Sequence, residues 1–347
     1  MNIRGRAIGP GQPCYLIAEM SANHNGRIER AIEIIRAAGD AGADAVKVQT
    51  YTADTLTIDC DNRYFQLGDH ALWGGKTLYQ LYREAAMPWD WHPRLLAEAE
   101  RAGLTLFSTP YDETAVDYLE GLGVPAYKIA SFELVDTPLL EKVAATGKPI
   151  ILSTGMAARE EVETAVQTLR RGGAGDLALL RCVSAYPADP AEMHLRTIPA
   201  MAEEFGAVAG LSDHTMGSAV AVAAVALGAS LIEKHLTLSR AEGGPDAAFS
   251  TEPAELRALV DAVRTAEKAL GKVRYGTTRG EQESLRFRRS IFAVRDIAPG
   301  ETFTKENVRV IRPGYGLPPS LYAQLLGRRA KKGLARGTPI PLEALED

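Results

Sequence analysis

Eight short apolar runs, separated by segments with helical spacing, constrain the fold of this chain more than any other feature. In most of the intervening segments apolar residues recur at three and four positions, and a Gly closes the end. The runs are CYLIAEM (14–20), DAVKVQT (44–50), LTLFSTP (104–110), PAYKIAS (125–131), KPIILST (148–154), DLALLRCV (176–183), AVAGLSD (207–213) and ASLIEKH (229–235). Strands that are apolar on both faces and alternate with helices predict a parallel sheet, and eight of them fit a closed (β/α)8 TIM barrel.

The alternative fold is an open, doubly wound α/β sheet. In such a sheet a Gly-rich phosphate-binding loop would be expected after an early strand. The first predicted strand is not followed by GxGxxG, so the closed barrel is the better interpretation.

The composition is that of a globular protein. Hydrophobic residues make up 46% of the 347 residues, which excludes disorder, and the net charge of −5 argues against nucleic acid or an anionic membrane as main partner. The longest nearly uncharged apolar run, 219–232, is too short to span a bilayer and predicts a buried helix followed by a strand. The N-terminus has no apolar signal core, and Cys14, Cys60 and Cys182 form no metal or disulfide pattern, so we expect a cytoplasmic location.

The pattern along the chain predicts two domains. The helix–strand repeat predicts a barrel domain over residues 1–275, followed by a polar and basic linker over 276–289. Short alternating stretches with Pro-Gly turns predict a small β-rich domain over residues 290–347. Two long connections, 51–88 and 239–250, interrupt the repeat, and loops of this length at the carboxyl end of a barrel usually build the site.

Polar side chains follow every predicted strand, although the strand bodies are apolar. These positions converge at the carboxyl-terminal face of a barrel, where burying so many polar groups is costly without a ligand. A lone Lys at a strand end is most often a solvated residue at the rim of the barrel. Two of them, Lys47 and Lys128, are better explained as residues that bind an anion. We therefore predict a cradle for phosphate and carboxylate built from Lys47, Thr109, Lys128, Ser131, Ser153 and Ser212.

Two histidines end successive strands and could share a metal ion. His214 and His235, with Glu19 across the mouth of the barrel, could hold a divalent cation such as Mn²⁺, Fe²⁺, Co²⁺ or Zn²⁺, with water in the other positions. The alternative is a hydrogen-bonded pair of core histidines. Asp246 could reach inward from the last long connection or simply be a turn residue. We expect structural or surface roles for the remaining candidates His70, His92 and His194.

Read together, several strings resemble the sialic acid synthase family, whose members condense phosphoenolpyruvate with an aldose to give a nonulosonic acid. The strings are AEMSANHNG (18–26), DAVKVQTY (44–51), FSTP (107–110), YKIASFE (127–133), STGM (153–156), LSDHT (211–215), EKHLTL (233–238) and GGPDAAFS (243–250). The C-terminal strings SIFAVRDIAPGE and IRPGYGLPP resemble the antifreeze-like SAF domain of the same enzymes. The resemblance covers almost the entire chain, in order.

Within that family, three strings look most like the pseudaminic acid synthases: YTADTLTID (51–59), KTLYQLYREAAMPWDWHP (76–93) and DHTMGSAVAVAAVALGA (213–229). This resemblance implies 2,4-diacetamido-2,4,6-trideoxy-altrose as the acceptor, and pseudaminic acid and phosphate as products. Legionaminic acid synthase and N-acetylneuraminate synthase are the close alternatives.

The resemblance also implies roles for individual residues. His214 and His235 match the family's metal ligands, for which we expect Mn²⁺, with Mg²⁺ or Co²⁺ as alternatives. The cradle named above matches groups around phosphoenolpyruvate. Four residues match positions near the acceptor and the reacting carbons: Glu19, Gln49, Tyr186 and Asp246. Many members have Asn where this chain has Ser184, so that contact is made through water or lost.

Arg312, in IRPGYG, matches an arginine that the family's SAF domain sends into the barrel of the other subunit. A tail of this size cannot hold a site alone, so the expected assembly is a domain-swapped homodimer.

In the expected mechanism Glu19 orients or moves the proton of the water that attacks C2. The rival functions are a metal-dependent aldolase that splits a 2-keto acid, and a carbohydrate-binding module on an inactive barrel.

Overall fold

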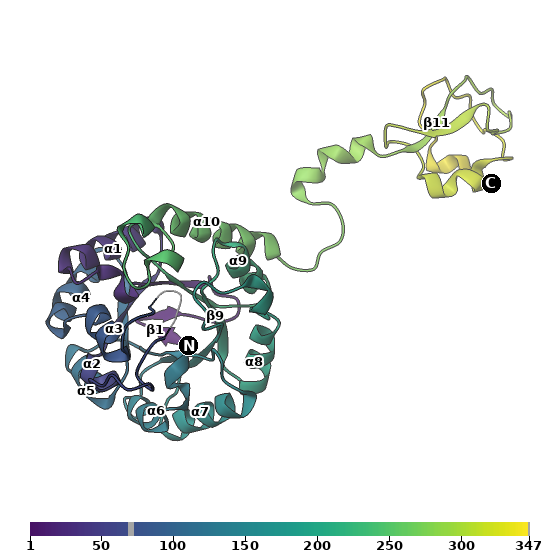
Figure 1. Ribbon diagram of the computed structural model, residues 1–347. Coiled ribbons are helices and arrows are strands. Elements are labelled where there is room, and N and C mark those ends of the chain that lie inside the picture. Colours follow the sequence, from purple (N-terminus) through teal and green to yellow (C-terminus); the bar gives the residue numbers. More distant parts are fainter. Residues whose placement is uncertain (69–72, 346–347) are drawn as a thin grey trace. The chain divides into compact units, whose positions relative to one another are not determined.

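The computed structural model describes residues 1–68 and 73–345. The chain divides into two compact units, Met1–Gly271 and Lys272–Asp347, which are described one at a time (Figure 1). His70, for which a structural or surface role is expected, lies outside the described residues.

The larger unit contains a closed barrel of eight parallel strands (Figure 1). Neighbours pair in the order β10-β3-β4-β5-β6-β7-β8-β9, so the first and last strands of the repeat close the ring. The strands are β3 (Tyr15–Glu19), β4 (Ala45–Thr50), β5 (Thr105–Pro110), β6 (Tyr127–Ile129), β7 (Ile150–Ser153), β8 (Leu177–Cys182), β9 (Val208–Asp213) and β10 (Leu231–His235). Each lies within one of the eight predicted runs, and the (β/α)8 barrel is confirmed.

Helices cover the outside of the barrel (Figure 1). In α1 (Ile28–Ala41) the periodic residues Ile34, Ile35 and Ala38 are fully buried, and the helix ends at Gly42 with φ 87°, a left-handed conformation that favours Gly. The other ring helices are α4 (His92–Arg101), α5 (Glu113–Leu122), α6 (Thr137–Ala144), α7 (Arg159–Arg171), α8 (Thr197–Phe205), α9 (Ala219–Ala226) and α10 (Pro253–Leu270). Over the described ranges, no helix has both the length and the apolar character needed to cross a membrane.

Short helices occupy the two long connections. After β4 these are α2 (Ala53–Leu56) and α3 (Leu78–Ala85), and after β10 they are the 3-10 helices Arg240–Glu242 and Ala247–Phe249. The indole N–H of Trp73 donates to the carbonyl oxygen of Pro245 at 3.0 Å. The two connections therefore meet at the carboxyl-terminal end of the barrel.

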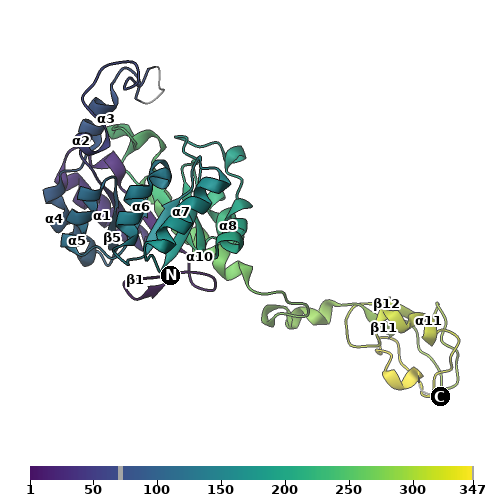
Figure 2. The same ribbon diagram turned by 90° about the horizontal axis from the view of Figure 1, so that it is seen from below.

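A hairpin that the repeat pattern did not predict lies at the other end of the barrel. Strands β1 (Asn2–Ile3) and β2 (Arg6–Ala7) pair antiparallel, on the side opposite α2 and α3 (Figure 2). Ile3 is fully buried and belongs to an apolar cluster inside the barrel with Tyr15, Phe107 and Leu180. This cluster fills the amino-terminal half of the barrel, as in other packed barrels of this type.

The smaller unit is built around an antiparallel pair of strands. These are β11 (Ser290–Ala293) and β12 (Val308–Ile311), accompanied by the short helix α11 (Tyr322–Leu325). Ile291 and Phe303 lie in its own buried core. The 3-10 helices Arg279–Glu281 and Glu283–Phe287 precede the strands. The small β-rich domain expected from the Pro-Gly turns is thus present.

Candidate active site

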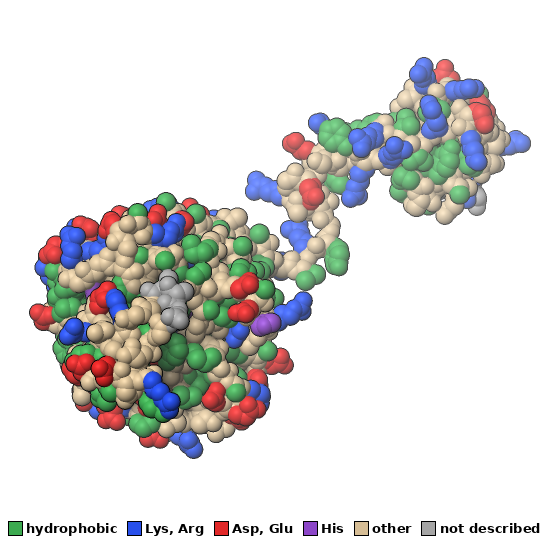
Figure 3. Space-filling view, viewed as in Figure 1, with side chains coloured by type: hydrophobic (Ala, Val, Ile, Leu, Met, Phe, Trp, Pro, Cys, Tyr) green, Lys and Arg blue, Asp and Glu red, His purple; other side chains and the backbone are tan. Residues whose placement is uncertain are grey.

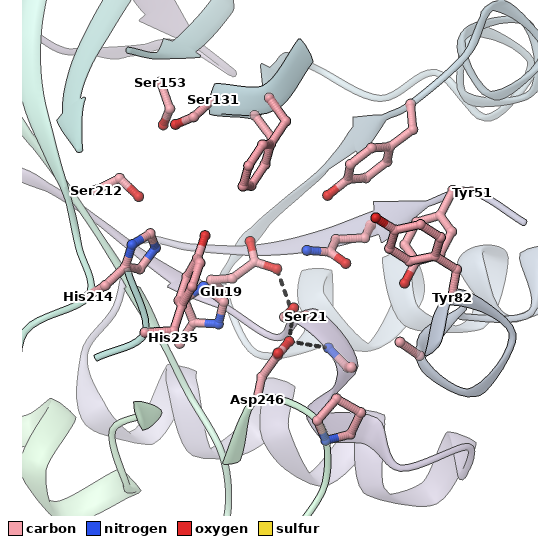
Figure 4. Close-up of a pocket in the computed structure, with 18 of the residues that line it drawn as sticks. Glu19, Ser21, Tyr51, Tyr82, Ser131, Ser153, Ser212, His214, His235 and Asp246 are labelled. Atoms are coloured by element: carbon pink, nitrogen blue, oxygen red, sulfur yellow. Dashed lines mark hydrogen bonds between the residues drawn. The ribbon is translucent and has the colours of Figure 1, made fainter. Parts of the chain in front are cut away.

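A cavity of about 260 Å³ opens at the carboxyl-terminal ends of the barrel strands (Figure 4). Strand ends and both long connections contribute to its wall. The candidate residues that line it are Glu19, Lys47, Gln49, Lys128, Ser131, Ser153, Tyr186, Ser212, His214, His235 and Asp246. The fold thus brings residues from most of the barrel strands into one site.

Two lysines and two glutamates form a buried charge cluster in this cavity. The ammonium group of Lys47 lies 2.7 Å from Oε2 of Glu19 and 2.9 Å from Oε1 of Glu233. Lys128 lies 3.5 Å from the same oxygen of Glu233, and the hydroxyl of Ser212 donates to it at 3.3 Å. All four charged side chains are 5% exposed or less. The lysines are therefore already paired with carboxylates.

Sequence reasoning did not predict this pairing with carboxylates. Sequence reasoning assigned no role to Glu233. The available signal was its position two residues before His235, which places both side chains on the same face of β10.

Burial has the largest single effect on the pKa values of Lys47 and Glu233. It lowers the pKa of Lys47 to about 7, although the negative charge of Glu233 opposes the shift. Burial alone would raise the pKa of Glu233, but the charges of Lys128 and Lys47 bring it down to about 2. Glu233 therefore stays ionised and pairs with both lysines.

The two predicted metal-binding histidines lie side by side. Their ring centroids are 5.3 Å apart, His214 directly after β9 and His235 at the end of the neighbouring strand β10. Nδ1 of His214 lies 2.8 Å from the carbonyl oxygen of Val183 and donates to it, which leaves Nε2 for a ligand. Nδ1 of His235 is buried without a hydrogen-bond partner, and burial holds the pKa of this ring well below its usual value. Burial alone would lower the pKa of His214, but the interaction with Cys182 raises it. In its deprotonated form an imidazole with a free nitrogen suits a divalent metal ion.

Glu19 is not placed as a third ligand. It lies on β3 directly beside His235, not across the mouth, and its Oε1 accepts from the backbone N–H of Ser21 at 2.7 Å while Oε2 pairs with Lys47. Within the residues that the structure describes, no group of three or more His, Cys, Asp or Glu could hold a metal. The residues fit a cation held by two imidazoles, with its other positions left for water or substrate oxygens.

The hydroxyl groups divide into two sets. Ser131, Ser153 and Ser212 lie at the histidine end of the cavity (Figure 4), and Oγ of Ser153 has no partner among the described residues. Thr109 and Ser184 do not line the cavity. Their hydroxyl oxygens are nevertheless buried and lack a described partner, and Thr109 pairs in register with Gln49 on β4.

Asp246 and Tyr186, both predicted to lie near the acceptor, have different neighbours in the cavity. Asp246 accepts from the hydroxyl of Ser21 and, at 3.3 Å, from the N–H of Ala22, so it ties the last connection to the end of β3 (Figure 4). Burial raises the pKa of Asp246. The ring of Tyr186 packs 4.4 Å from that of His214. Arg312 is exposed on the smaller unit.

The remaining histidines differ from those of the cavity. His92 is fully buried and bonds through its ring nitrogens to Thr50 and the carbonyl of Trp89, a structural role. His194 is exposed.

Sequence reasoning missed most of the aromatic and apolar residues that line the cavity. Beyond the candidate residues the cavity is lined by Tyr51, Leu56, Leu67, Leu78, Leu81, Tyr82, Ala85, Tyr111, Phe132, Glu133 and Phe249, among others. Many come from the connection after β4, which the sequence predicted to help build the site without indicating which of its side chains line the cavity. Burial raises the pKa of Glu133 to about 7, and its Oε2 has no described hydrogen-bond partner.

Comparison with known proteins agrees with this fold. Residues 34–275 match the NeuB family, and residues 288–346 match the SAF domain. The chain is 41% identical to a pseudaminic acid synthase of Helicobacter pylori, with 96% of this chain and 98% of the relative covered. A pseudaminic acid synthase of Campylobacter jejuni is also 41% identical, with 94% and 95% covered.

More distant relatives are synthases of other nonulosonic acids. An N,N'-diacetyllegionaminic acid synthase of Legionella pneumophila is 36% identical, with 97% of this chain and 96% of the relative covered. The crystal structure of an N-acetylneuraminic acid synthetase from Leptospira borgpetersenii has a TM-score of 0.72 and 31% identity, and covers 83% of this chain and 95% of its own. The chain therefore belongs to the NeuB family and carries a SAF domain at its C-terminal end.

Proposed function

We propose that this NeuB-family enzyme, a transferase, condenses phosphoenolpyruvate with 2,4-diacetamido-2,4,6-trideoxy-altrose to give pseudaminic acid and phosphate. The observation that carries the proposal is the buried cluster of Lys47, Lys128 and Glu233 beside two histidines in one cavity. The names of the relatives at 41% identity support the choice of acceptor.

The lysines hold the anionic substrate. Lys47 and Lys128 bind the phosphate and carboxylate of phosphoenolpyruvate, while the hydroxyls of Ser131, Ser153 and Ser212 donate hydrogen bonds at fixed points. Glu233 keeps both ammonium groups in place before the substrate arrives. These contacts orient C3 of phosphoenolpyruvate toward the aldehyde carbon of the acceptor.

His214 and His235 would hold the divalent ion, with Mn²⁺ first and Mg²⁺ or Co²⁺ as alternatives. When bound, such an ion supplies Lewis-acid polarisation of the aldehyde. The hydrogen bond from His214 to the carbonyl of Val183 orients that ring.

The bond changes balance without an added oxidant. C3 of phosphoenolpyruvate forms a C–C bond to the aldehyde carbon, whose oxygen takes a proton, and C2 becomes electrophilic. Water adds to C2, and Glu19 accepts its proton. The tetrahedral intermediate then breaks its C–O bond and expels phosphate, which Lys47 and Lys128 stabilise as it leaves.

The assembly we propose is a domain-swapped homodimer in which Arg312 completes the site of the other subunit. Residues 272–347 carry 15 Lys and Arg against 8 Asp and Glu, a net charge of +7, and basic side chains are prominent on the visible face of that unit (Figure 3). Residues 1–271 carry 24 against 36, a net charge of −12. Opposite charges of this size favour association between copies.

Exposed apolar residues around the cavity support the same assembly. They follow the ends of β4, β6, β7 and β9, and comprise Ile58, Tyr64, Phe132, Val135, Met156 and Met216. A partner subunit would cover such a surface. We further propose a cytoplasmic location, which suits the three free cysteines.

Incubation of the purified protein with phosphoenolpyruvate and Mn²⁺ tests the function. The acceptors are the altrose derivative, the corresponding legionaminic precursor and N-acetylmannosamine, with phosphate release and product mass as readouts. We expect the highest kcat/KM with the altrose derivative. Product from pyruvate without phosphate release would indicate the aldolase instead, and no product from any acceptor would reject the proposal.

A further inference from the structure

The cavity has two chemically different ends. Ser153, Ser212 and His214 gather at one end, whereas Tyr51 and Tyr82 lie at the other (Figure 4). The reaction proposed above uses only the first end and the middle. We call the second end, formed by Leu56, Leu78, Leu81, Tyr82 and Ala85, the apolar wall. All five residues come from α2 and α3.

The apolar wall is held in place by packing. Leu81 and Ala85 are buried, and Thr77 caps the first turn of α3 by accepting from the backbone N–H of Gln80. Beside the wall, the buried ring of Tyr51, which also lines the cavity, packs edge-on against Tyr82, at 6.1 Å between centroids. A surface supported in this way is formed before a ligand binds, which is what selective recognition requires.

The wall is suited to methyl groups. Leucine and alanine side chains offer no hydrogen bond, so a substrate hydroxyl placed against them would lose its bonds to water without replacement. A methyl group placed there gains burial instead. Next to the wall, the unpartnered Oε2 of Glu133 can accept the N–H that accompanies an acetamido methyl.

We propose that the apolar wall is the specificity subsite for the acceptor, and that it selects sugars with methyl groups at the end remote from the aldehyde. A 6-deoxy carbon and a second acetamido group both present such methyls. This inference rests on the proposed function, because the reacting aldehyde must lie at the histidine end. It makes α2 and α3 responsible for discrimination against sugars with hydroxyls at that end.

The test compares Leu78→Ser with Leu122→Ser, a matched change at a half-buried leucine of α5 that does not line the cavity. In Leu78→Ser we expect kcat/KM for the altrose derivative to fall about 10- to 100-fold, the size of effect that methyl packing produces in enzyme pockets. The ratio of kcat/KM for the altrose derivative to kcat/KM for N-acetylmannosamine should fall. KM for phosphoenolpyruvate should stay within about twofold of the wild-type value. Leu78→Ala gives a milder second variant in case the serine impairs folding. An unchanged preference in both variants would overturn the inference.

Saturation-transfer NMR of the altrose derivative, without phosphoenolpyruvate, separates the inference from the proposed reaction. It reports contact between the methyl protons and the protein in the absence of turnover. We expect saturation transfer to the methyl groups in the wild type and in Leu122→Ser, and its loss in Leu78→Ser. This result would support the role of the apolar wall in acceptor binding even if no product forms. Equal transfer in all three proteins, or no binding at all, would reject it.

Discussion

Lys47 and Lys128 converge on one oxygen atom, Oε1 of Glu233, at 2.9 and 3.5 Å. The lysines lie on β4 and β6, which are separated by β5, and the glutamate lies on β10. Glu19, whose Oε2 lies 2.7 Å from the ammonium group of Lys47, supplies a second buried carboxylate to the same cluster. The oxygen shared by the two lysines is the centre of the buried charge cluster.

Glu233→Gln should make the protein depend on an anion for stability. Both ammonium groups lose their shared carboxylate, and breaking a buried ion pair in this way costs about 3–5 kcal/mol. Phosphoenolpyruvate should then raise Tm more in the variant than in the wild type, because it supplies the missing charge. Differential scanning fluorimetry measures this, with the surface variant Glu160→Gln as control. Equal ligand-induced shifts would contradict the role of Glu233.

Lys128→Ala should mainly raise KM for phosphoenolpyruvate, by about 10- to 100-fold, because a charged hydrogen bond to the substrate is lost. Steady-state kinetics with varied phosphoenolpyruvate measure the change. Lys142→Ala removes a surface lysine of α6 that pairs with Asp117 and should leave KM unaltered. An unchanged KM in Lys128→Ala would place Lys128 outside the substrate contacts.

His235→Ala should abolish turnover and lower the metal content of the purified protein. The variant leaves His214 as a single imidazole, which binds a divalent ion far more weakly than a pair. Elemental analysis and phosphate-release assays with added Mn²⁺ provide the readouts. The exposed His194→Ala serves as the control. Full activity in the variant, or in chelator-treated wild type, would exclude the metal role.

Glu133→Gln should change how stability depends on pH. Burial raises the pKa of Glu133 from 4.5 to about 7, so the folded protein keeps a proton that the unfolded chain releases between these values. The stabilising contribution is fully present below pH 4.5 and is lost as the pH rises through about 7. Glutamine cannot ionise. The variant should therefore gain up to about 3 kcal/mol relative to wild type between about pH 4.5 and 8.

Chemical unfolding at these two pH values measures the difference for Glu133. Glu141→Gln changes an exposed glutamate of α6 and should show no such trend. A stability difference between Glu133→Gln and wild type that is the same at both pH values would show that Glu133 ionises normally.

Mixing two inactive variants tests the swapped dimer. Arg312→Ala and His235→Ala should each lose activity, whereas co-expression should restore about a quarter of wild-type activity, because half of the dimers then contain one intact site. The intact site combines the barrel of one chain with Arg312 of the other. No restoration, together with heterodimers detected by differential tags, would show that Arg312 does not act on the other subunit's barrel.

The pattern of the sequence was sufficient for the barrel because strand and helix periodicity are local properties. Each of the eight runs is an apolar segment bounded by polar turns, and each forms a strand within its predicted limits. The polar positions late in the runs likewise predicted that Lys47 and His235 enter one site, and both side chains line the cavity.

What the tertiary structure alone decided is which side chains meet. The pairing of Glu233 with Lys47 and Lys128 depends on the closure of the barrel, which brings β10 within reach of β4 and β6. The apolar wall depends on how α2 and α3 fold back over the cavity, and no periodic signal marks that path. Local patterns report the environment of one segment, whereas contacts between distant segments follow from the packing of the whole domain.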